Sequence, residues 1–217
     1  MYKQLIDQFF KENGVKNDKV PSAPAIANFK IKMFMSSEAS EKFSELIDGK
    51  ILKSQPKRGE MVEAERREIE SATTSEQIIR FMRRSPDIIN ESPLVKQALL
   101  FENEVIPEIL KRLKTSLNTG FIETSTKILA ASSINVAEDL IGYYDDVRSP
   151  YAQGMILVIL GFKAKEAHIP WIIEKYKTLK KLYPNETYSD GAIYALDEIE
   201  NRFYEEDEIN DKKNELG

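Results

Sequence analysis

A pair of adjacent apolar residues recurs along this chain at nearly constant spacing. The steps between pairs are 31, 31 and 32 residues, and the pairs are Ile78-Ile79, Ile109-Leu110, Leu140-Ile141 and Ile172-Ile173. From residue 75 onward, apolar residues follow the three-to-four-residue spacing of amphipathic helices, with few of the alternating runs that indicate strands. A period of this length is typical of a repeated supersecondary unit, so an all-α fold built of repeats is predicted.

A second set of helix signals lies between these pairs. Each consists of turn or capping residues followed by a large apolar residue, as in Ser92-Pro93-Leu94, Thr119-Gly120-Phe121, Ser149-Pro150-Tyr151 and Glu186-Thr187-Tyr188. In the two Ser-Pro signals, we expect Ser to cap the helix and Pro to be its first residue. A two-helix unit of about thirty residues buries its apolar faces only by stacking on its neighbours. The sequence therefore predicts an α-α superhelix of about four helical hairpins.

Small residues in the second helices indicate close packing. Tyr151-Ala152-Gln153-Gly154 matches Tyr188-Ser189-Asp190-Gly191. A glycine inside a helix costs about 1 kcal/mol relative to alanine, and close approach of another helix is the commonest compensation. We therefore expect Thr124, Gly154 and Gly191 to lie where neighbouring helices approach one another.

One turn carries a more specific pattern. Asp145, the Val147-Arg148 pair and the small residue Ala152 mark the passage between two predicted helices. In these residues the unit from Asn135 to Ala152 resembles a HEAT-like repeat, and the resemblance extends over about residues 75–204. It implies an armadillo-type superhelix in which Arg148 bonds a turn carboxylate or carbonyl. The Val-Arg element occurs in one turn only, so a full ladder of Asp and Arg side chains is not expected.

The rest of the chain divides around this predicted repeat domain, residues 75–204. Residues 1–53 are expected to form an N-terminal helical segment, with amphipathic helices over 1–12 and about 25–47, that serves as an arm or a cap. Residues 54–74 are expected to be a linker and a charged helix that packs weakly or bridges to the repeats. Residues 205–217 are an acidic polar tail, and we predict that its removal leaves the fold intact. The C-terminal helix is expected to run antiparallel to the helix before it.

Composition excludes several kinds of site. The chain has no Cys, which rules out disulfides, thiolate nucleophiles and Cys-ligated metals. A net charge of -5 gives no general attraction to nucleic acid or to anionic membranes. There is no signal-peptide core and no apolar stretch of membrane-spanning length, so we expect a cytoplasmic protein without membrane association.

Catalytic signals are absent from the sequence. The single His, His168, stands where sister units have Val105 and Val136, and we expect it to be a helix-end residue. No phosphate-binding glycine loop or nucleophile elbow occurs, so neither a cofactor nor a metal is expected, and no enzyme activity is predicted. Two basic clusters are interpreted as solvated helix faces, and they comprise Arg80, Arg83 and Arg84, and Lys175, Lys177, Lys180 and Lys181.

These features favour a non-enzymatic protein–protein interaction module, an adaptor or scaffold that binds a protein partner on the concave face of the repeats. Stacked second helices would align Phe121, Tyr151 and Tyr188, or their neighbours Glu123, Gln153 and Asp190, in one strip. Because aromatic and Arg side chains often anchor interfaces, the candidate contacts are Tyr144, Asp145, Arg148, Tyr151, Trp171, Tyr188 and Asp190. Two alternatives follow from the resemblance. One is a nucleic-acid enzyme similar to the HEAT-like alkylpurine DNA glycosylases, although the net negative charge of the chain argues against it. The other is a tetrapyrrole-handling protein similar to the HEAT-like phycobilisome lyases.

Overall fold

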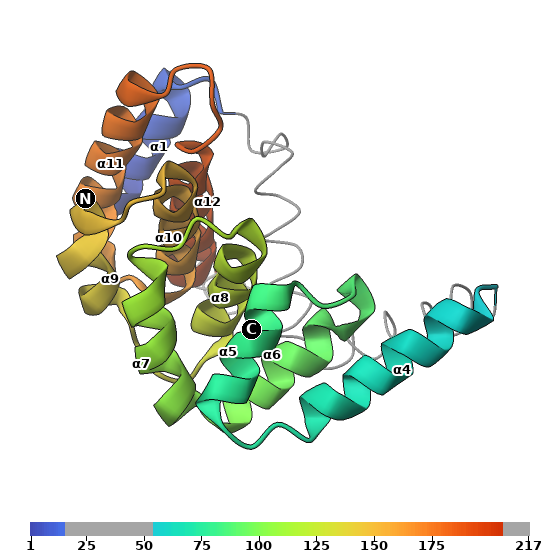
Figure 1. Ribbon diagram of the computed structural model, residues 1–217. Coiled ribbons are helices and arrows are strands. Elements are labelled where there is room, and N and C mark those ends of the chain that lie inside the picture. Colours follow the sequence, from blue (N-terminus) through green and yellow to red (C-terminus); the bar gives the residue numbers. More distant parts are fainter. Residues whose placement is uncertain (16–53, 206–217) are drawn as a thin grey trace, which may run out of the picture. The chain divides into compact units, whose positions relative to one another are not determined.

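The computed structural model describes residues 1–15 and 54–205, and every regular element in these two ranges is a helix (Figure 1). The α-helices are α1 (Tyr2–Glu12), α4 (Pro56–Glu70), α5 (Ser75–Arg84), α6 (Glu91–Leu100), α7 (Glu102–Leu113), α8 (Thr119–Ala131), α9 (Ala137–Tyr143), α10 (Pro150–Lys163), α11 (Ile169–Leu182) and α12 (Asp190–Glu200). Short 3-10 turns are η2 (Ile88–Asn90), η3 (Tyr144–Asp146) and η4 (Glu166–His168), and η5 (Asn201–Glu205) is a π-helical turn. The helix expected over about 25–47 and most of the acidic tail lie outside the described residues.

The predicted alternation of helices is confirmed. The four apolar pairs lie in α5, α7, α9 and α11, and the second set of helix signals leads into α6, α8, α10 and α12. Ile109, Leu140 and Ile172, which hold the same position in three successive pairs, each have 0% exposed surface. The apolar period of the sequence therefore marks equivalent buried positions.

One of the two Ser-Pro signals is a helix start. Ser149 caps α10, because its Oγ accepts from the Ala152 N–H at 3.3 Å, and Pro150 is the first helical residue. The other expectation is wrong, since α6 begins at Glu91 and Pro93 is its third residue. The preceding turn η2 leads directly into α6, so this helix starts two residues earlier than the Ser-Pro pattern indicates.

The chain divides into two compact units, and the boundary falls between Ala152 and Gln153, in the first turn of α10. Among the described residues, one unit consists of 54–152 and the other of 1–15 with 153–205. The expected repeat domain, residues 75–204, thus contributes to both units.

In the 54–152 unit, corresponding helices of successive hairpins are neighbours. Helix α5 packs against α6, α7 and α8, while α6 also packs against α7 and α8. Helix α4 lies along α6 and η2 (Figure 1). The two hairpins α5–α6 and α7–α8 share one apolar core, whose largest fully buried side chains include Ile78, Met82, Leu94, Ile109 and Phe121.

Helix α4 is attached by polar contacts as well as by its buried side chains Val62 and Ile69. The Arg58 guanidinium forms a bidentate pair with the Asp87 carboxylate, in which Nε donates to Oδ2 at 3.0 Å and Nη2 donates to Oδ1 at 3.1 Å. Asn90 is fully buried, and its Nδ2 donates to the Val62 carbonyl at 2.9 Å and to Glu65 Oε2 at 2.7 Å. This charged helix therefore joins the neighbouring hairpin through specific hydrogen bonds.

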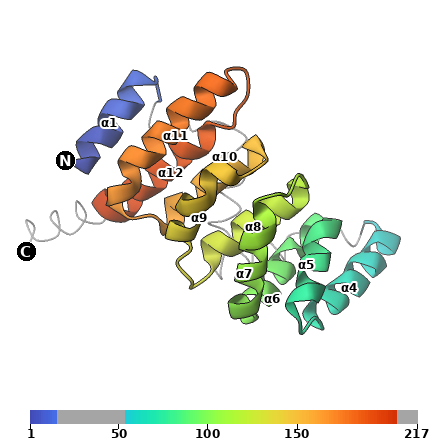
Figure 2. The ribbon, with the colours of Figure 1, turned by 60° about the vertical axis from the view of Figure 1, so that its left-hand side comes forward.

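In the other unit, α11 and α12 form an antiparallel hairpin with α1 packed on both (Figure 2). Ile6, Phe9 and Phe10 of α1 are buried, and the Phe9 ring meets the Tyr176 ring edge-on at 4.8 Å. The antiparallel course is confirmed at the far end, where Arg202 donates to the Ala164 carbonyl at 2.8 Å. Helix α1 thus covers part of the α11–α12 hairpin.

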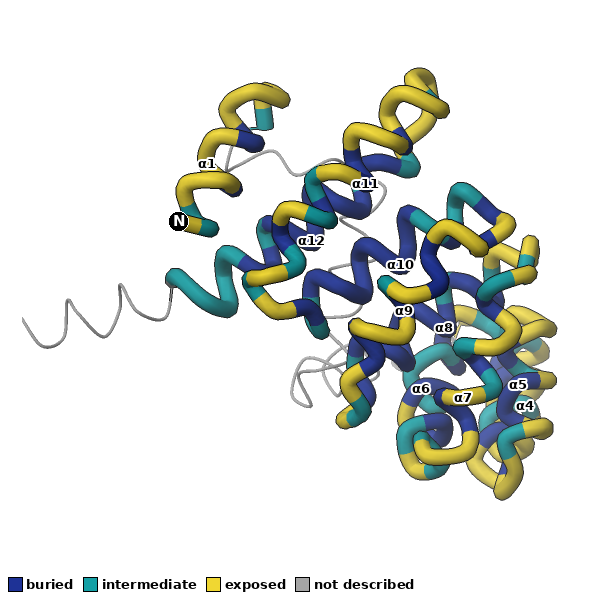
Figure 3. Tube along the Cα trace, turned by 90° about the vertical axis from the view of Figure 1, so that its left-hand side faces the viewer, coloured by how far each residue is buried: buried dark blue, intermediate teal, exposed yellow. Residues whose placement is uncertain are grey.

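Helices α10 and α12 approach one another at glycines. A Cβ atom built on Gly191 would lie 2.0 Å from the Gly154 carbonyl oxygen, and one on Gly161 would lie 3.0 Å from the Ala195 Cα. The two contacts advance along both helices in the same direction, so α10 and α12 run parallel. Figure 3 shows α10 almost entirely buried. The expected close packing at Gly154 and Gly191 is confirmed, and Thr124 is buried in the other unit.

Candidate partner-binding pocket

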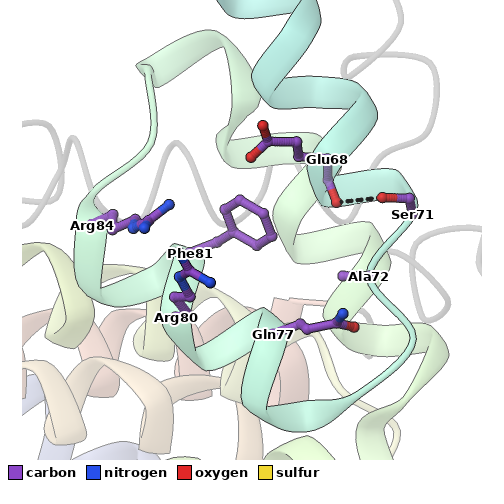
Figure 4. Close-up of a pocket in the computed structure, with 7 residues that line it drawn as sticks. All are labelled: Glu68, Ser71, Ala72, Gln77, Arg80, Phe81 and Arg84. Atoms are coloured by element: carbon purple, nitrogen blue, oxygen red, sulfur yellow. Dashed lines mark hydrogen bonds between the residues drawn. The ribbon is translucent and has the colours of Figure 1, made fainter.

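A pocket of about 220 Å³ lies between the end of α4 and one face of α5 (Figure 4). The α4 side of the pocket is formed by Glu68, Ser71 and Ala72, and the α5 side by Gln77, Arg80, Phe81 and Arg84. The α5 residues recur at steps of three and one, so they share one helix face. The opposite face of α5 carries Ile78, Ile79 and Met82, which are buried in the core. Burial of the apolar face thus turns the pocket face outward.

Local sequence fixes both ends of α5. Thr74 and Gln77 form a capping box, in which Thr74 Oγ1 accepts from the Gln77 N–H and Gln77 Oε1 accepts from the backbone N–H groups of Thr73 and Thr74. The helix stops at Ser85, which has a left-handed φ of 52°. The four pocket residues of α5 are therefore held on a helix with defined ends.

The connection between α4 and α5 is also anchored. Ser71 Oγ donates to the Glu68 carbonyl at 2.9 Å, and the side chain of Gln97, from α6, donates to the Ala72 carbonyl at 2.6 Å. Ala72 is buried. The α4 wall of the pocket is therefore fixed to the same hairpin as the α5 wall, which gives a preformed surface.

The α5 wall carries two cations beside an aromatic ring. Arg80 and Arg84 are exposed and lie beside Phe81, which is half-buried (Figure 4). In the described parts of the chain, neither guanidinium makes a hydrogen bond or an ion pair. Glu68, on the facing wall, is exposed and its carboxylate likewise has no partner there. The pocket thus offers two guanidinium groups, one aromatic face and one carboxylate to a ligand.

The described residues form neither a metal-binding cluster nor a membrane-spanning helix. Residues 1–15 and 54–205 contain no group of three or more His, Asp or Glu side chains that could hold a metal ion. Within the same ranges, no helix has the length and apolarity to cross a bilayer. His168 lies at the start of α11, as expected, and its Nδ1 accepts from the Lys165 N–H at 3.1 Å.

Four of the predicted contact residues belong to the 54–152 unit. Tyr144 is buried, whereas Asp145 and Arg148 are exposed. Tyr151 is half-buried, and its hydroxyl donates to Glu123 Oε1 at 2.7 Å. Burial raises the pKa of the Tyr151 phenol well above its usual value, and the hydrogen bond to Glu123 raises it further. Phe121 is 1% exposed, so it cannot belong to a surface strip with Tyr151.

The prediction for the Arg148 side chain is wrong. Its backbone N–H donates to the Lys114 carbonyl at 2.8 Å, but its guanidinium bonds no carboxylate or carbonyl of the described residues. Arg148 projects from the turn after η3 and is exposed. This outcome weakens the HEAT-like interpretation of the turn and leaves the guanidinium available to a partner.

The other three predicted contacts belong to the second unit and do not form one site. Trp171 lies near the start of α11, while Tyr188 meets Tyr183 edge-on at 5.4 Å beyond the other end of that helix. Asp190 begins α12, beside Tyr188 in sequence. Since each helical residue advances about 1.5 Å, Trp171 is roughly 18 Å along α11 from the Tyr183–Tyr188 pair.

One of the lysines expected to be solvated is buried. Lys175 is 8% exposed, and its Nζ lies 5.3 Å from the centre of the Trp171 ring. The Lys175 ammonium therefore makes a cation–π contact with the Trp171 ring, which helical spacing alone does not reveal. Lys177, Lys180 and Lys181 are exposed, as expected.

Sequence reasoning found two of the pocket residues, Arg80 and Arg84, but assigned them to a solvated face. It missed Gln77, Phe81 and the α4 wall. The available signal was an aromatic residue on the outer face of α5 between two arginines, at a position where a charged or small polar residue is usual. The α4 wall had no signal, because the approach of α4 to α5 depends on contacts made by both helices with α6.

No protein-family model, curated protein or solved structure matches this chain. The roles of the pocket residues are therefore deduced from their geometry and chemistry.

Proposed function

We propose that this chain is a non-enzymatic protein-binding module of HEAT-like helical hairpins, and that the pocket between α4 and α5 receives a side chain of its partner. The neighbouring positions of α5 with α7 and of α6 with α8 support a hairpin stack in one unit. The parallel packing of α10 on α12 supports the same arrangement in the other. A stack of this kind presents rows of side chains to a partner, including the exposed Arg148.

The observation that carries the proposal is that the guanidinium groups of Arg80 and Arg84, which bond nothing among the described residues, lie beside the half-buried Phe81. Arginine and aromatic residues on a fixed surface are the usual anchors of protein interfaces. The pocket volume, about 220 Å³, is below the roughly 300–1,000 Å³ of typical small-molecule and cofactor sites. Its size therefore favours one side chain of a larger partner over a free substrate.

Photo-crosslinking inside cells that naturally express this chain tests the proposal. Benzoylphenylalanine replaces Phe81, since it is also aromatic, and in a control it replaces Leu100, which is 74% exposed on α6 in the same unit. We expect a defined protein adduct from the Phe81 position and none, or a different one, from Leu100. If the two positions give the same set of adducts, or Phe81 gives none, the pocket is not the contact surface.

A further inference from the structure

The two walls of the pocket differ in charge, and this difference defines the segment that fits. Arg80 and Arg84 lie on the α5 wall, and Glu68 lies on the α4 wall (Figure 4). Resting on the proposed function, we infer that the pocket binds an acidic segment of a partner protein in which an apolar side chain is flanked by carboxylates. The apolar side chain enters between Ala72 and Phe81, and the carboxylates bind the two arginines.

The arginines account for the acidic character of the partner. Guanidinium groups bind carboxylates through two parallel hydrogen bonds, and such charge-assisted bonds are stronger than neutral ones. Arg80 and Arg84 have no partner among the described residues. The two guanidinium groups can therefore bind a carboxylate without first breaking an ion pair to any described residue. They are one helical turn apart on α5, so two carboxylates near one another in a segment can be bound together.

Phe81 and Ala72 account for the apolar side chain. Phe81 is half-buried and lines the pocket together with the buried Ala72, so part of the pocket lining is apolar. A volume of about 220 Å³ leaves room for one large side chain. Displacing water from the Phe81 ring favours an apolar group.

Glu68 argues against nucleic acid as the occupant. A phosphate backbone offers a row of negative charges and needs a continuous basic surface. Here the Glu68 carboxylate faces the arginines across the pocket, so the basic surface is not continuous. The backbone N–H groups of a peptide can donate hydrogen bonds to such a carboxylate. A pocket with basic residues on one wall and an acidic residue on the other therefore suits a peptide better than a nucleic acid.

Fluorescence anisotropy with the full chain tests the inference. The probe is a short labelled Gly-Ser peptide that carries glutamates around one leucine, and matched peptides replace the glutamates with lysine or the leucine with serine. Arg80→Glu and Arg84→Glu are compared with Arg83→Glu, which makes the same charge change on the same helix. Arg83 is exposed and does not line the pocket. Circular dichroism establishes that each variant is folded.

We expect the acidic peptide to bind, each pocket variant to weaken it about tenfold, and Arg83→Glu to change it less than about twofold. The serine peptide should bind more weakly, and the double variant Arg80→Glu/Arg84→Glu should prefer the lysine peptide. Equal losses for Arg83→Glu and Arg84→Glu would mean diffuse attraction and overturn the inference. Tighter binding of a single-stranded oligonucleotide than of the acidic peptide would overturn it in favour of nucleic acid. A Phe81 crosslink to a partner without acidic segments would refute this inference and leave the proposed function standing.

Discussion

Gly191 of α12 lies directly on the backbone of Gly154 of α10, so that a Cβ atom on Gly191 would be 2.0 Å from the Gly154 carbonyl oxygen. A second contact is also tight, since a Cβ on Gly154 would lie 2.6 Å from the Tyr188 carbonyl oxygen. Both obstacles are backbone atoms, one in α10 and one in the turn that leads into α12, so neither can move without shifting the backbone. The two residues that match in sequence thus meet in space.

Replacing Gly191 by alanine should destabilise the protein by about 2 kcal/mol or more, because the added methyl group forces α10 and α12 apart. The matched control is Gly142→Ala in α9, where a Cβ would meet nothing within 4 Å. That change should be neutral or stabilise by up to about 1 kcal/mol, since alanine favours the helix. Urea unfolding of both variants measures the difference, and equal effects would mean that α10 and α12 do not touch there.

Lys127 and Glu91 form a buried ion pair between α8 and α6, with 2.6 Å between Nζ and Oε1 and side-chain exposures of 3% and 15%. Lys127→Met should cost about 3 kcal/mol or more, because it leaves the Glu91 carboxylate buried without its cation. The double variant Lys127→Met/Glu91→Leu should recover most of that loss. A double variant as unstable as the single one would show that the cost comes from packing and not from charge.

Asn90 holds α4 in place, so Asn90→Ala should loosen that helix. The change removes the bonds to the Val62 carbonyl and to Glu65, and it should cost about 2 kcal/mol. Hydrogen exchange should accelerate across α4 and its pocket wall. The control Asn135→Ala removes a local bond to the Ala137 N–H in the same unit and should leave exchange in α4 unchanged. Unchanged exchange of α4 in Asn90→Ala would contradict this attachment.

The Tyr204 phenol should lose its proton at a higher pH than an ordinary tyrosine does. Burial, a hydrogen bond to Glu166 and the nearby charges of Glu166, Tyr2 and Glu200 raise the pKa of the Tyr204 phenol from 10.0 to about 12. Because the folded state holds this proton more tightly than the unfolded state, the stabilisation is complete below pH 10 and is lost as the pH rises to about 12. Ring-carbon NMR measures the titration, and Glu166→Gln should lower the pKa. A Tyr204 pKa near 10 would contradict the placement of η5 beside η4.

The apolar period predicted the helices well because burial imposes it directly. Every helix from α5 to α12 follows from where Ile, Leu and aromatic residues recur, and Gly154 and Gly191 were identified because their surroundings match. In both cases the signal is local. The start of α6 was misplaced by two residues because η2 joins it without a break.

Contacts between distant segments were not predictable in the same way. Helix α1 packs on α11 and α12, which lie more than 150 residues further along the chain. No sequence pattern in α1 indicates which helices it packs against. Arg148 matched a repeat turn, but the side-chain bond also needs a partner at the right distance. The pocket depends on α4 and α5 meeting over a shared helix, so Arg80 and Arg84 alone indicated only a charged face.

The most direct test of the proposed binding site is the NMR signal of the arginine side chains during titration with the acidic peptide. The account predicts that the Nε–H signals of Arg80 and Arg84 shift and saturate together, while that of Arg83 stays in place. Amide shifts should concentrate between Glu68 and Arg84. Equal movement of all three arginine signals, or saturable shifts centred elsewhere in the chain, would contradict a binding site between α4 and α5.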